Sequence, residues 1–329
     1  MTFETKNKIL VIRLSSLGDI LLTTPVLRAI MQKYPGSEIH FLVKSQYANA
    51  VWFNPNISKL FTYDKEKVQS LIQDLKSNKY DFIVDLHNNF RSRSVTRSLK
   101  VKTYRFSKPS LQKFLLVKFK INLLKELKSI PRRYTEAVEG LELDSNGLEL
   151  IIPDETKSKL PDNENYIGLC PGSQHYTKRW LPEYFIELGN LLKENGNKIV
   201  IFGGSSDKDI CSEISKGISG SINLQNDNNL FQTVADMKKC MLIVTNDTGL
   251  MHAAAAVGIP LISIFGSSVK EFGFSPYGIK NLILENNSLN CRPCSHIGRS
   301  ECPKGHFKCM KELTPQLVFN QLQNFLKSI

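Results

Sequence analysis

The chain has 329 residues, of which 41% are hydrophobic, and it contains seven cysteines. This length predicts two domains of roughly 150 residues each. The odd cysteine count, with no secretory signal before Arg13, argues against a disulfide framework and for reduced thiols. The longest apolar stretch, 253–265, is interrupted by Gly258 and Pro260 and is far below the roughly 20 residues of a membrane span. We therefore expect a cytoplasmic protein.

The net charge of +12 is concentrated in one segment. Residues 91–133 contain 14 Lys or Arg and one acidic residue, Glu126, so the rest of the chain is nearly neutral. This segment favours an anionic partner. Because no nucleic-acid motif accompanies the charge, we do not expect a nucleic-acid partner. The remaining candidates for the anionic partner are an anionic membrane surface and a phosphate-bearing lipid substrate.

Residues 111–130, drawn as a helix, place five lysines on about half of the circumference and most apolar residues on the other side. The pattern is imperfect, since four apolar residues lie among the lysines. Two interpretations stay open. The helix packs on the core of its own domain, or it makes a peripheral contact with the inner leaflet of the inner membrane.

Short apolar runs alternate with helical patterns along the chain. The first set of strands is predicted at 8–14, 38–43, 59–63, 81–86 and 102–106. A polar stretch at 143–165 is typical of a linker. Beyond it, strands are predicted at 166–170, 198–204, 240–246 and 260–266, separated by helices near 182–195, 205–217, 229–239 and 248–257. This alternation predicts an α/β protein with two Rossmann-like halves, followed by an amphipathic helix with Thr314 as N-cap and Pro315 at its first position.

The corner after the first strand is "RLSSLGDILLTTP", residues 13–25. It lacks the glycine patterns of dinucleotide-binding and P-loop corners, and Asp19 would repel a diphosphate at the helix start. We therefore expect no phosphate at this corner. A carboxylate here is suited to accept a proton from a hydroxyl nucleophile. The alternative is that Asp19 only caps the helix.

Two corners of the second half suit a diphosphate better. "CPGSQHYTKRWLP", residues 170–182, places Gly172 and Ser173 in a turn before Lys178 and Arg179. Small turn residues and a lysine can neutralise a diphosphate without a metal, although Lys178 is equally compatible with a solvated surface charge.

The second corner, "TNDTGLMHAAAAVGIP" at 245–260, gives the stronger signal. Thr248 and Gly249 begin a helix whose backbone N–H groups favour an anion. Asp247 is placed to orient the loop or to meet a ribose hydroxyl. His252, one turn into the helix, is either a further ligand contact or an ordinary core histidine.

Three stretches, "RLSSLGDILLTTPVL", "PGSQHYTKRWLPEYF" and "NDTGLMHAAAAVGIPLISIFG", in this order and at these separations, resemble the glycosyltransferase family 9 enzymes, the ADP-heptose:lipopolysaccharide heptosyltransferases. The resemblance covers nearly the whole chain. It implies a GT-B architecture with two facing Rossmann-like domains, an acceptor-binding one at 1–155 and a nucleotide-sugar-binding one at 156–313. A final helix at 314–329 would pack on the N-terminal domain.

The resemblance also implies an inverting, metal-independent transfer from ADP-heptose, without a cofactor, to an anionic lipid-linked saccharide acceptor. Asp19 takes the family's catalytic base position. Ser16 and Gly18 would line the donor sugar, and the ADP moiety would be surrounded by Lys178, Asp247, Thr248, Gly249 and His252, with Ser173 in the turn beside it. The acceptor candidates are Arg13, which stands where some members have lysine, with Arg91 and Arg93 of the basic segment.

Other functions stay open on sequence grounds. The same pair of domains occurs with other sugar donors and in UDP-sugar epimerases, and a non-catalytic protein that binds nucleotides or polyanions would keep the fold without the chemistry. A retaining double displacement would need a second carboxylate as nucleophile, and the sequence offers no obvious candidate.

"CRPCSHIGRSECPKGHFKCM" holds Cys291, Cys294, Cys302 and Cys309. C-x-x-C is a common zinc half-site, but the second pair is separated by six residues and does not match a zinc ribbon. We favour a compact loop of reduced thiols, and a structural zinc site or a disulfide is the alternative.

Overall fold

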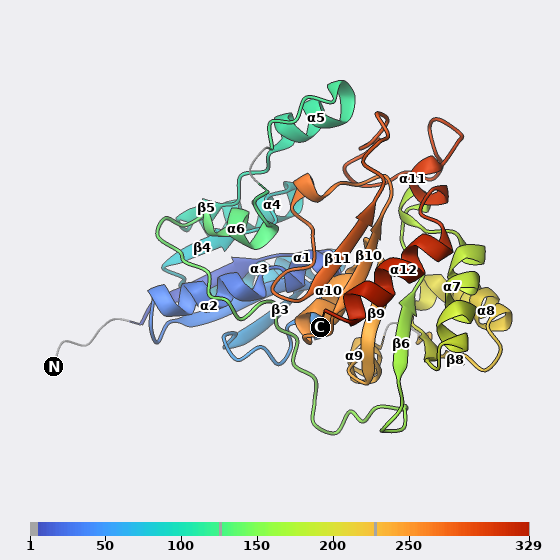
Figure 1. Cartoon of the computed structure of the whole chain (residues 1–329). Coiled ribbons are helices and arrows are strands. Elements are labelled where there is room, and N and C mark those ends of the chain that lie inside the picture. Colours follow the sequence, from blue (N-terminus) through green and yellow to red (C-terminus); the bar gives the residue numbers. More distant parts are fainter. Residues whose placement is uncertain (1–5, 125–126, 227–228, 329) are drawn as a thin grey trace. The chain divides into compact units, whose positions relative to one another are not determined.

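The computed structural model describes residues 6–124, 127–226 and 229–328. The chain forms two compact units, one within Met1–Pro109 and Lys128–Ile151, the other within Ser110–Leu127 and Ile152–Ile329. Each unit is built on its own parallel sheet (Figure 1). The division differs from the predicted single boundary near 155, because 110–127 belong with the second unit. Within the described ranges no helix is long and apolar enough to cross a membrane.

The first unit has a five-stranded sheet in the order β3-β2-β1-β4-β5. Its strands are β1 (Lys8–Ile12), β2 (Glu38–Lys44), β3 (Lys59–Tyr63), β4 (Phe82–Asp85) and β5 (Thr103–Arg105). Its helices are α1 (Leu17–Leu21), α2 (Thr24–Lys33), α3 (Val68–Ser77), α4 (Phe90–Leu99) and α6 (Ile130–Thr135). All five strands match the predicted runs. The strand order reverses between β1 and β4, so the loops that follow these two strands meet at a topological switch point.

The second unit has a six-stranded sheet in the order β11-β10-β9-β6-β7-β8. Its strands are β6 (Tyr166–Cys170), β7 (Lys198–Ile201), β8 (Ile222–Asn223), β9 (Cys240–Asn246), β10 (Leu261–Phe265) and β11 (Asn281–Glu285). Its helices are α5 (Ser110–Phe119), α7 (Pro182–Glu194), α8 (Lys208–Gly217), α9 (Leu230–Met237), α10 (Gly249–Ala256), α11 (Lys308–Lys311) and α12 (Pro315–Leu326). The sequence did not predict β8 or β11. The switch point here lies between β6 and β9.

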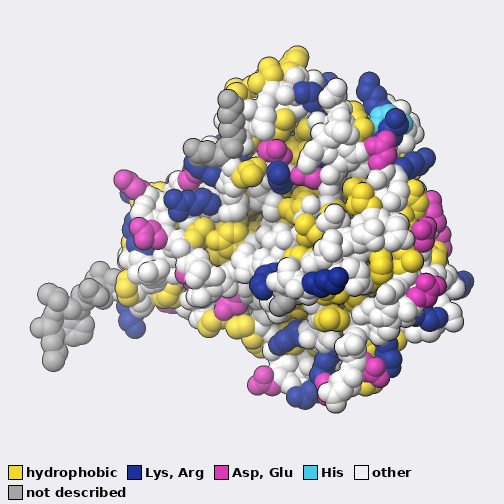
Figure 2. Space-filling model, viewed as in Figure 1, with side chains coloured by type: hydrophobic (Ala, Val, Ile, Leu, Met, Phe, Trp, Pro, Cys, Tyr) yellow, Lys and Arg dark blue, Asp and Glu magenta, His cyan; other side chains and the backbone are white. Residues whose placement is uncertain are grey.

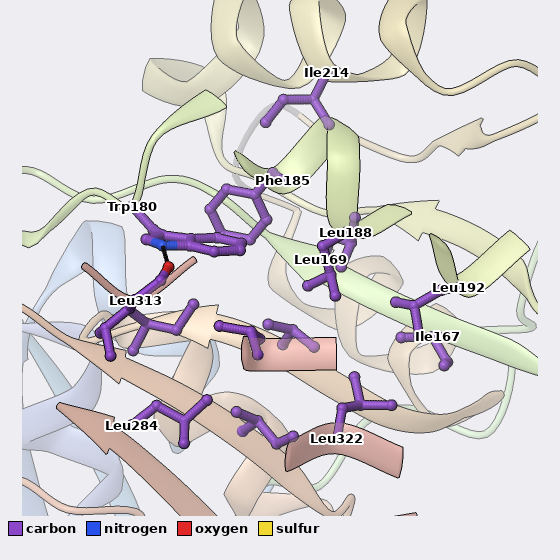
Figure 3. Packing of buried hydrophobic residues seen from close by; sticks show 14 of the residues in the cluster. Ile167, Leu169, Trp180, Phe185, Leu188, Leu192, Ile214, Leu284, Leu313 and Leu322 are labelled. Carbon is purple, nitrogen blue, oxygen red and sulfur yellow. Dashed lines mark hydrogen bonds between the residues drawn. The ribbon is translucent and has the colours of Figure 1, made fainter. Parts of the chain in front are cut away.

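Trp180 belongs to the buried core cluster of the second unit (Figure 3). Its indole is fully buried, its ring packs edge-on against Phe185 at 5.0 Å, and its Nε1–H donates to the Leu313 carbonyl at 2.8 Å. A buried indole N–H needs such a partner. This bond fixes the segment that leads into α12.

The final helix begins as predicted. The hydroxyl of Thr314 accepts a hydrogen bond from the Leu317 backbone N–H, and Pro315 is the first helical residue. Val318 and Leu322 are fully buried in the core cluster that includes Leu188 of α7. The apolar side of α12 is therefore covered by the second unit. A contact of this helix with the N-terminal domain stays a prediction.

The structure corrects the expected helix over 111–130. Helix α5 ends at Phe119, and Lys120 adopts a left-handed backbone conformation with φ of 60°. The Lys120 ammonium donates to the carbonyls of Cys291 and Pro293, at 3.1 and 2.7 Å, which draws the chain away from the helix axis. Residues 125–126 lie outside the described part.

Candidate functional site

Asp19 lies in the first turn of α1, directly after the loop that follows β1. Its Oδ1 forms an ion pair with Arg13 at 2.6 Å, and its Oδ2 accepts from the Ser16 hydroxyl at 2.8 Å and from the Ser16 backbone N–H at 3.1 Å. Its side chain is 18% exposed. Asp19 therefore caps the helix, and its side chain is fixed but still partly exposed.

Arg13 holds this corner together. Its guanidinium donates to the carbonyls of Ser15 and Leu86, at 2.9 and 2.7 Å, in addition to pairing with Asp19. Burial opposes its charge, but electrostatic interactions with Asp19 and Tyr134 outweigh burial and raise the pKa of Arg13. A lysine could not supply this fork of donors. Arg13 is therefore a positioning group for Asp19.

The loop after β4 brings further polar groups to this corner. Asp85 is fully buried and accepts from the backbone N–H groups of His87 and Asn88 and from the Ser92 hydroxyl. Burial, with the charge of Arg13, lowers the pKa of His87 to about 3, so its imidazole is neutral at physiological pH. The His87 Nδ1 atom is buried with no hydrogen-bond partner. Burial and the charge of Arg13 also lower the pKa of Lys108.

The sequence prediction missed Asp85, His87 and Lys108. A signal was present, because "DLHNN" at 85–89 follows a buried strand in the manner of the first corner. Only the strand order, which puts β4 beside β1, makes the two loops neighbours.

The other first-unit candidates take separate places. Gly18 is buried in α1 beside Asp19, and Ser16 is the N-cap of that helix. Arg93 of α4 is exposed and donates to the Asn88 side chain at 2.8 Å, and its charge acts on Lys108. Arg91 is half-buried on the same helix. The structure thus brings Arg13 to Asp19 and leaves the roles of Arg91 and Arg93 as predictions.

The second unit pairs two of the predicted residues directly. The Lys178 ammonium lies 2.7 Å from Asp247 Oδ2, and the Ser268 hydroxyl donates to the same oxygen at 2.6 Å. The two charged side chains are 16% and 9% exposed. Burial alone would raise the pKa of Asp247, but Lys178 and the Ser268 hydrogen bond hold it below its ordinary value. Lys178 is therefore not a solvated surface charge.

Thr248 and His252 complete the corner after β9. Thr248 is the N-cap of α10, and its hydroxyl is buried with no hydrogen-bond partner. Gly249 follows as the first helical residue, so its N–H is one of the helix-start donors without an intrahelical acceptor. His252 is 3% exposed one turn below and acts electrostatically on Asp247. An orphaned hydroxyl beside free donors is suited to an anionic ligand.

The loop after β6 is tied to the loop after β9. The Asn246 side chain accepts from the Trp180 backbone N–H at 3.0 Å and donates to the Pro171 carbonyl at 2.7 Å. Ser173 is buried, and its carbonyl accepts from Arg179 at 2.6 Å. Both loops thus meet at the switch point between β6 and β9.

Two further residues near this corner escaped the sequence prediction. Ser268 follows β10 in the run "FGSS" and fixes Asp247. Arg292 is almost fully buried and donates to the carbonyls of Gly266 and Ser268, at 2.6 and 2.8 Å, and to Glu285 at 2.8 Å. Arg292 lies within the cysteine-rich stretch, which therefore braces the loop that carries Ser268.

The four cysteines of the C-terminal stretch have free thiols. Cys291, Cys294, Cys302 and Cys309 line one small cavity together with His306. Burial raises the pKa of Cys309 to about 12. In the described part of the chain, no three His, Cys, Asp or Glu side chains are arranged as a metal site. No disulfide joins these four cysteines, and the compact loop of reduced thiols and the structural zinc site stay predictions.

Two α/β units, each with a parallel sheet and with polar loops gathered at its switch point, give this chain the GT-B fold. The model of glycosyltransferase family 9 (heptosyltransferase) matches residues 68–304, and the chain belongs to this family.

The relatives agree over almost the full length. The chain is 27% identical over 328 residues to lipooligosaccharide heptosyltransferase 2 of Campylobacter jejuni subsp. jejuni serotype O:2, covering 95% of this chain and 96% of the relative. The fold of this chain is similar to that of a family 9 glycosyltransferase from Veillonella parvula DSM 2008 (TM-score 0.82, 24% identity, 99% of each chain covered). The same holds for E. coli ADP-heptose lps heptosyltransferase II (TM-score 0.75, 24% identity, 98% and 99% of the two chains).

Proposed function

We propose that this enzyme is an inverting, metal-independent heptosyltransferase that moves a heptose from ADP-heptose to an acceptor in the inner core of lipopolysaccharide. The family assignment and the activities of its relatives support the reaction class. The observation that carries the mechanism is Asp19, whose carboxylate is held by Arg13 and Ser16 and whose side chain is partly exposed.

In the proposed step an acceptor hydroxyl attacks the anomeric carbon of the heptose. The new oxygen–carbon bond forms as the bond to the ADP phosphate breaks, the hydroxyl proton passes to the Asp19 carboxylate, and ADP departs. One displacement inverts the configuration, and one base is enough. Ser16 and Arg13 fix both carboxylate oxygens, which lowers the entropic cost of placing the base.

The second unit supplies groups that suit the leaving diphosphate. The Thr248 hydroxyl, the N–H groups at the start of α10 and the Lys178 ammonium are donors for phosphate oxygens. Asp247 holds Lys178 in place through their ion pair. In the first unit, Arg13, Lys108 and Arg93 give the surroundings of Asp19 a positive charge, which suits an acceptor with phosphate or acidic sugars.

The test is Asp19→Asn, which preserves the shape of the side chain and removes the base. We expect the rate of heptose transfer, followed by mass spectrometry of a truncated lipopolysaccharide acceptor, to fall by about 10²–10⁴-fold. ADP affinity should stay unchanged. Asp74→Asn, the same change at an exposed position of α3, is the matched control and should keep the wild-type rate. Turnover of the asparagine variant at the wild-type rate would refute the role of Asp19.

Donor choice and metal independence are tested with the same protein. ADP at 100 times its dissociation constant should raise the free energy of unfolding by about 2.7 kcal/mol, and UDP should add much less. Transfer should continue in excess EDTA. Stabilisation by UDP in place of ADP would favour another sugar nucleotide as donor.

A further inference from the structure

Residues 111–127 expose an unusual number of large apolar side chains. Leu111, Phe114, Phe119, Ile121, Leu123 and Leu127 are each between 50% and 66% exposed, and we call them the α5 patch. Single exposed apolar residues are ordinary, but six within 17 residues mark an interaction surface. In Figure 2 hydrophobic side chains gather, with Lys and Arg beside them, at the top of the view, where Figure 1 shows α5.

The opposite side of the same segment is already fixed to the second unit. Leu116 and Leu124 are buried in a cluster with Val269 and Phe272. The Lys113 ammonium lies over the ring of Phe272, 5.9 Å from its centroid. The α5 patch is therefore held in place facing outward, because the segment has already buried its other side in this unit.

Lysines accompany the α5 patch. Residues 111–124 contain three lysines, at 113, 118 and 120, and no acidic residue, and the one acidic residue of the segment 111–127 is Glu126. The Phe114 and Phe119 rings contact each other edge-on, with centroids 6.0 Å apart, so they form one apolar surface. Apolar rings beside lysines suit the interface of an anionic bilayer, where rings enter the acyl boundary and ammonium groups reach lipid phosphates. A second copy docked through the same patch would bring like charges together.

We propose that the α5 patch docks the protein on the surface of an anionic lipid bilayer. The biological role of this lipid contact rests on the proposed function, because the contact would keep the enzyme at the membrane where a lipid-anchored acceptor lies. The physical binding itself depends only on the patch. Phe114 and Phe119 supply the apolar insertion, and Lys118, which is exposed, supplies attraction to the lipid phosphates.

The experiment measures flotation of the full-length protein with vesicles. One set contains phosphatidylethanolamine and phosphatidylglycerol, the other phosphatidylcholine alone. We expect binding to the anionic vesicles that weakens with salt, and much weaker binding to the neutral ones. The double variant Phe114→Ser/Phe119→Ser should bind at least about tenfold more weakly. Lys118→Gln should bind about fivefold more weakly, since one lysine near such a surface contributes about that factor.

The matched control is Leu317→Ser, an exposed leucine of α12, which should bind like the wild type. Far-ultraviolet circular dichroism and stabilisation by ADP show that each variant is folded. Equal binding of the wild type and the double serine variant, or equal binding to both kinds of vesicle, would overturn the proposal. So would a dimer that the serine variant dissociates, in the absence of any vesicle binding.

The two proposals fail separately. Transfer to a soluble, delipidated acceptor should be the same in the wild type and the double serine variant, because the patch is not part of the chemistry. Vesicle binding without any heptose transfer would refute the proposed function and leave the α5 patch as a lipid-binding surface. Transfer without vesicle binding would refute the lipid contact alone.

Discussion

Replacement of Lys178 by methionine removes the cation that faces Asp247 and keeps the length of the side chain. The two charges are 2.7 Å apart and are mostly buried. Loss of one partner of a buried ion pair typically costs about 3–5 kcal/mol. Since Lys178 keeps some exposure and Asp247 keeps the Ser268 hydroxyl, we expect the free energy of unfolding to fall by about 2–3 kcal/mol at pH 7.

The loss of stability in this variant should depend on pH. In the wild type, Lys178 holds the pKa of Asp247 below its ordinary 3.8 despite burial, so the pair stabilises the fold above about pH 4 and the stabilisation is lost as the pH falls further. In the variant, burial dominates and the ionised carboxylate is disfavoured. The deficit of the variant should therefore be largest at neutral pH and should shrink toward pH 4.

Urea unfolding of the full chain at pH 7 and near pH 4 measures this deficit. Lys193→Met, which removes an exposed lysine from α7, is the matched control and should change stability little. The double variant Lys178→Met/Asp247→Asn should recover most of the loss, because no buried charge is left without a partner. A deficit at pH 7 no larger than that of Lys193→Met would refute the reasoning, and so would an equal deficit at both pH values.

Two further predictions concern buried groups without hydrogen-bond partners. Thr248→Val removes a buried hydroxyl that has no hydrogen-bond partner, so the free energy of unfolding should stay the same or rise slightly. ADP affinity, measured by calorimetry, should fall about tenfold, and a lower free energy of unfolding would contradict the reasoning. His87 is neutral in the fold down to about pH 3, whereas an unfolded histidine binds a proton below about 6.5. Between pH 7 and 5 the wild type should therefore lose up to about 2 kcal/mol more unfolding free energy than His87→Gln, and equal losses in urea titrations would show that His87 is accessible to protons.

The sequence was sufficient for most of the framework, because fully buried parallel strands leave continuous apolar runs. β6 and β9 begin and end at the predicted residues. β8 has two residues and carries no such run. β11 is only partly buried at the edge of its sheet, so its hydrophobic pattern is weaker than that of a central strand.

Site residues could be predicted from the sequence where a single loop contains them. They could not be predicted where the strand order of the sheet brings two separate loops together. Asp19 and the 245–260 corner stand out within single stretches. His87 joins Asp19 only because β4 pairs with β1, and Ser268 joins Asp247 only because their loops follow neighbouring strands. The helix expected over 111–130 failed for a similar reason, since the carbonyls that hold Lys120 come from residues about 170 positions later in the chain.

The route of the chain has a consequence for any attempt to divide this protein. The backbone passes from one unit to the other after residues 109, 127 and 151, so it crosses three times. If the chain were divided at the polar stretch near 155, Leu116 and Leu124 would be on one fragment and Val269 and Phe272 on the other. Each fragment would then expose apolar side chains that are buried in the full chain. After proteolytic cleavage in that stretch, the contacts of Leu116 and Leu124 with Val269 and Phe272 would still hold the N-terminal fragment on the second unit.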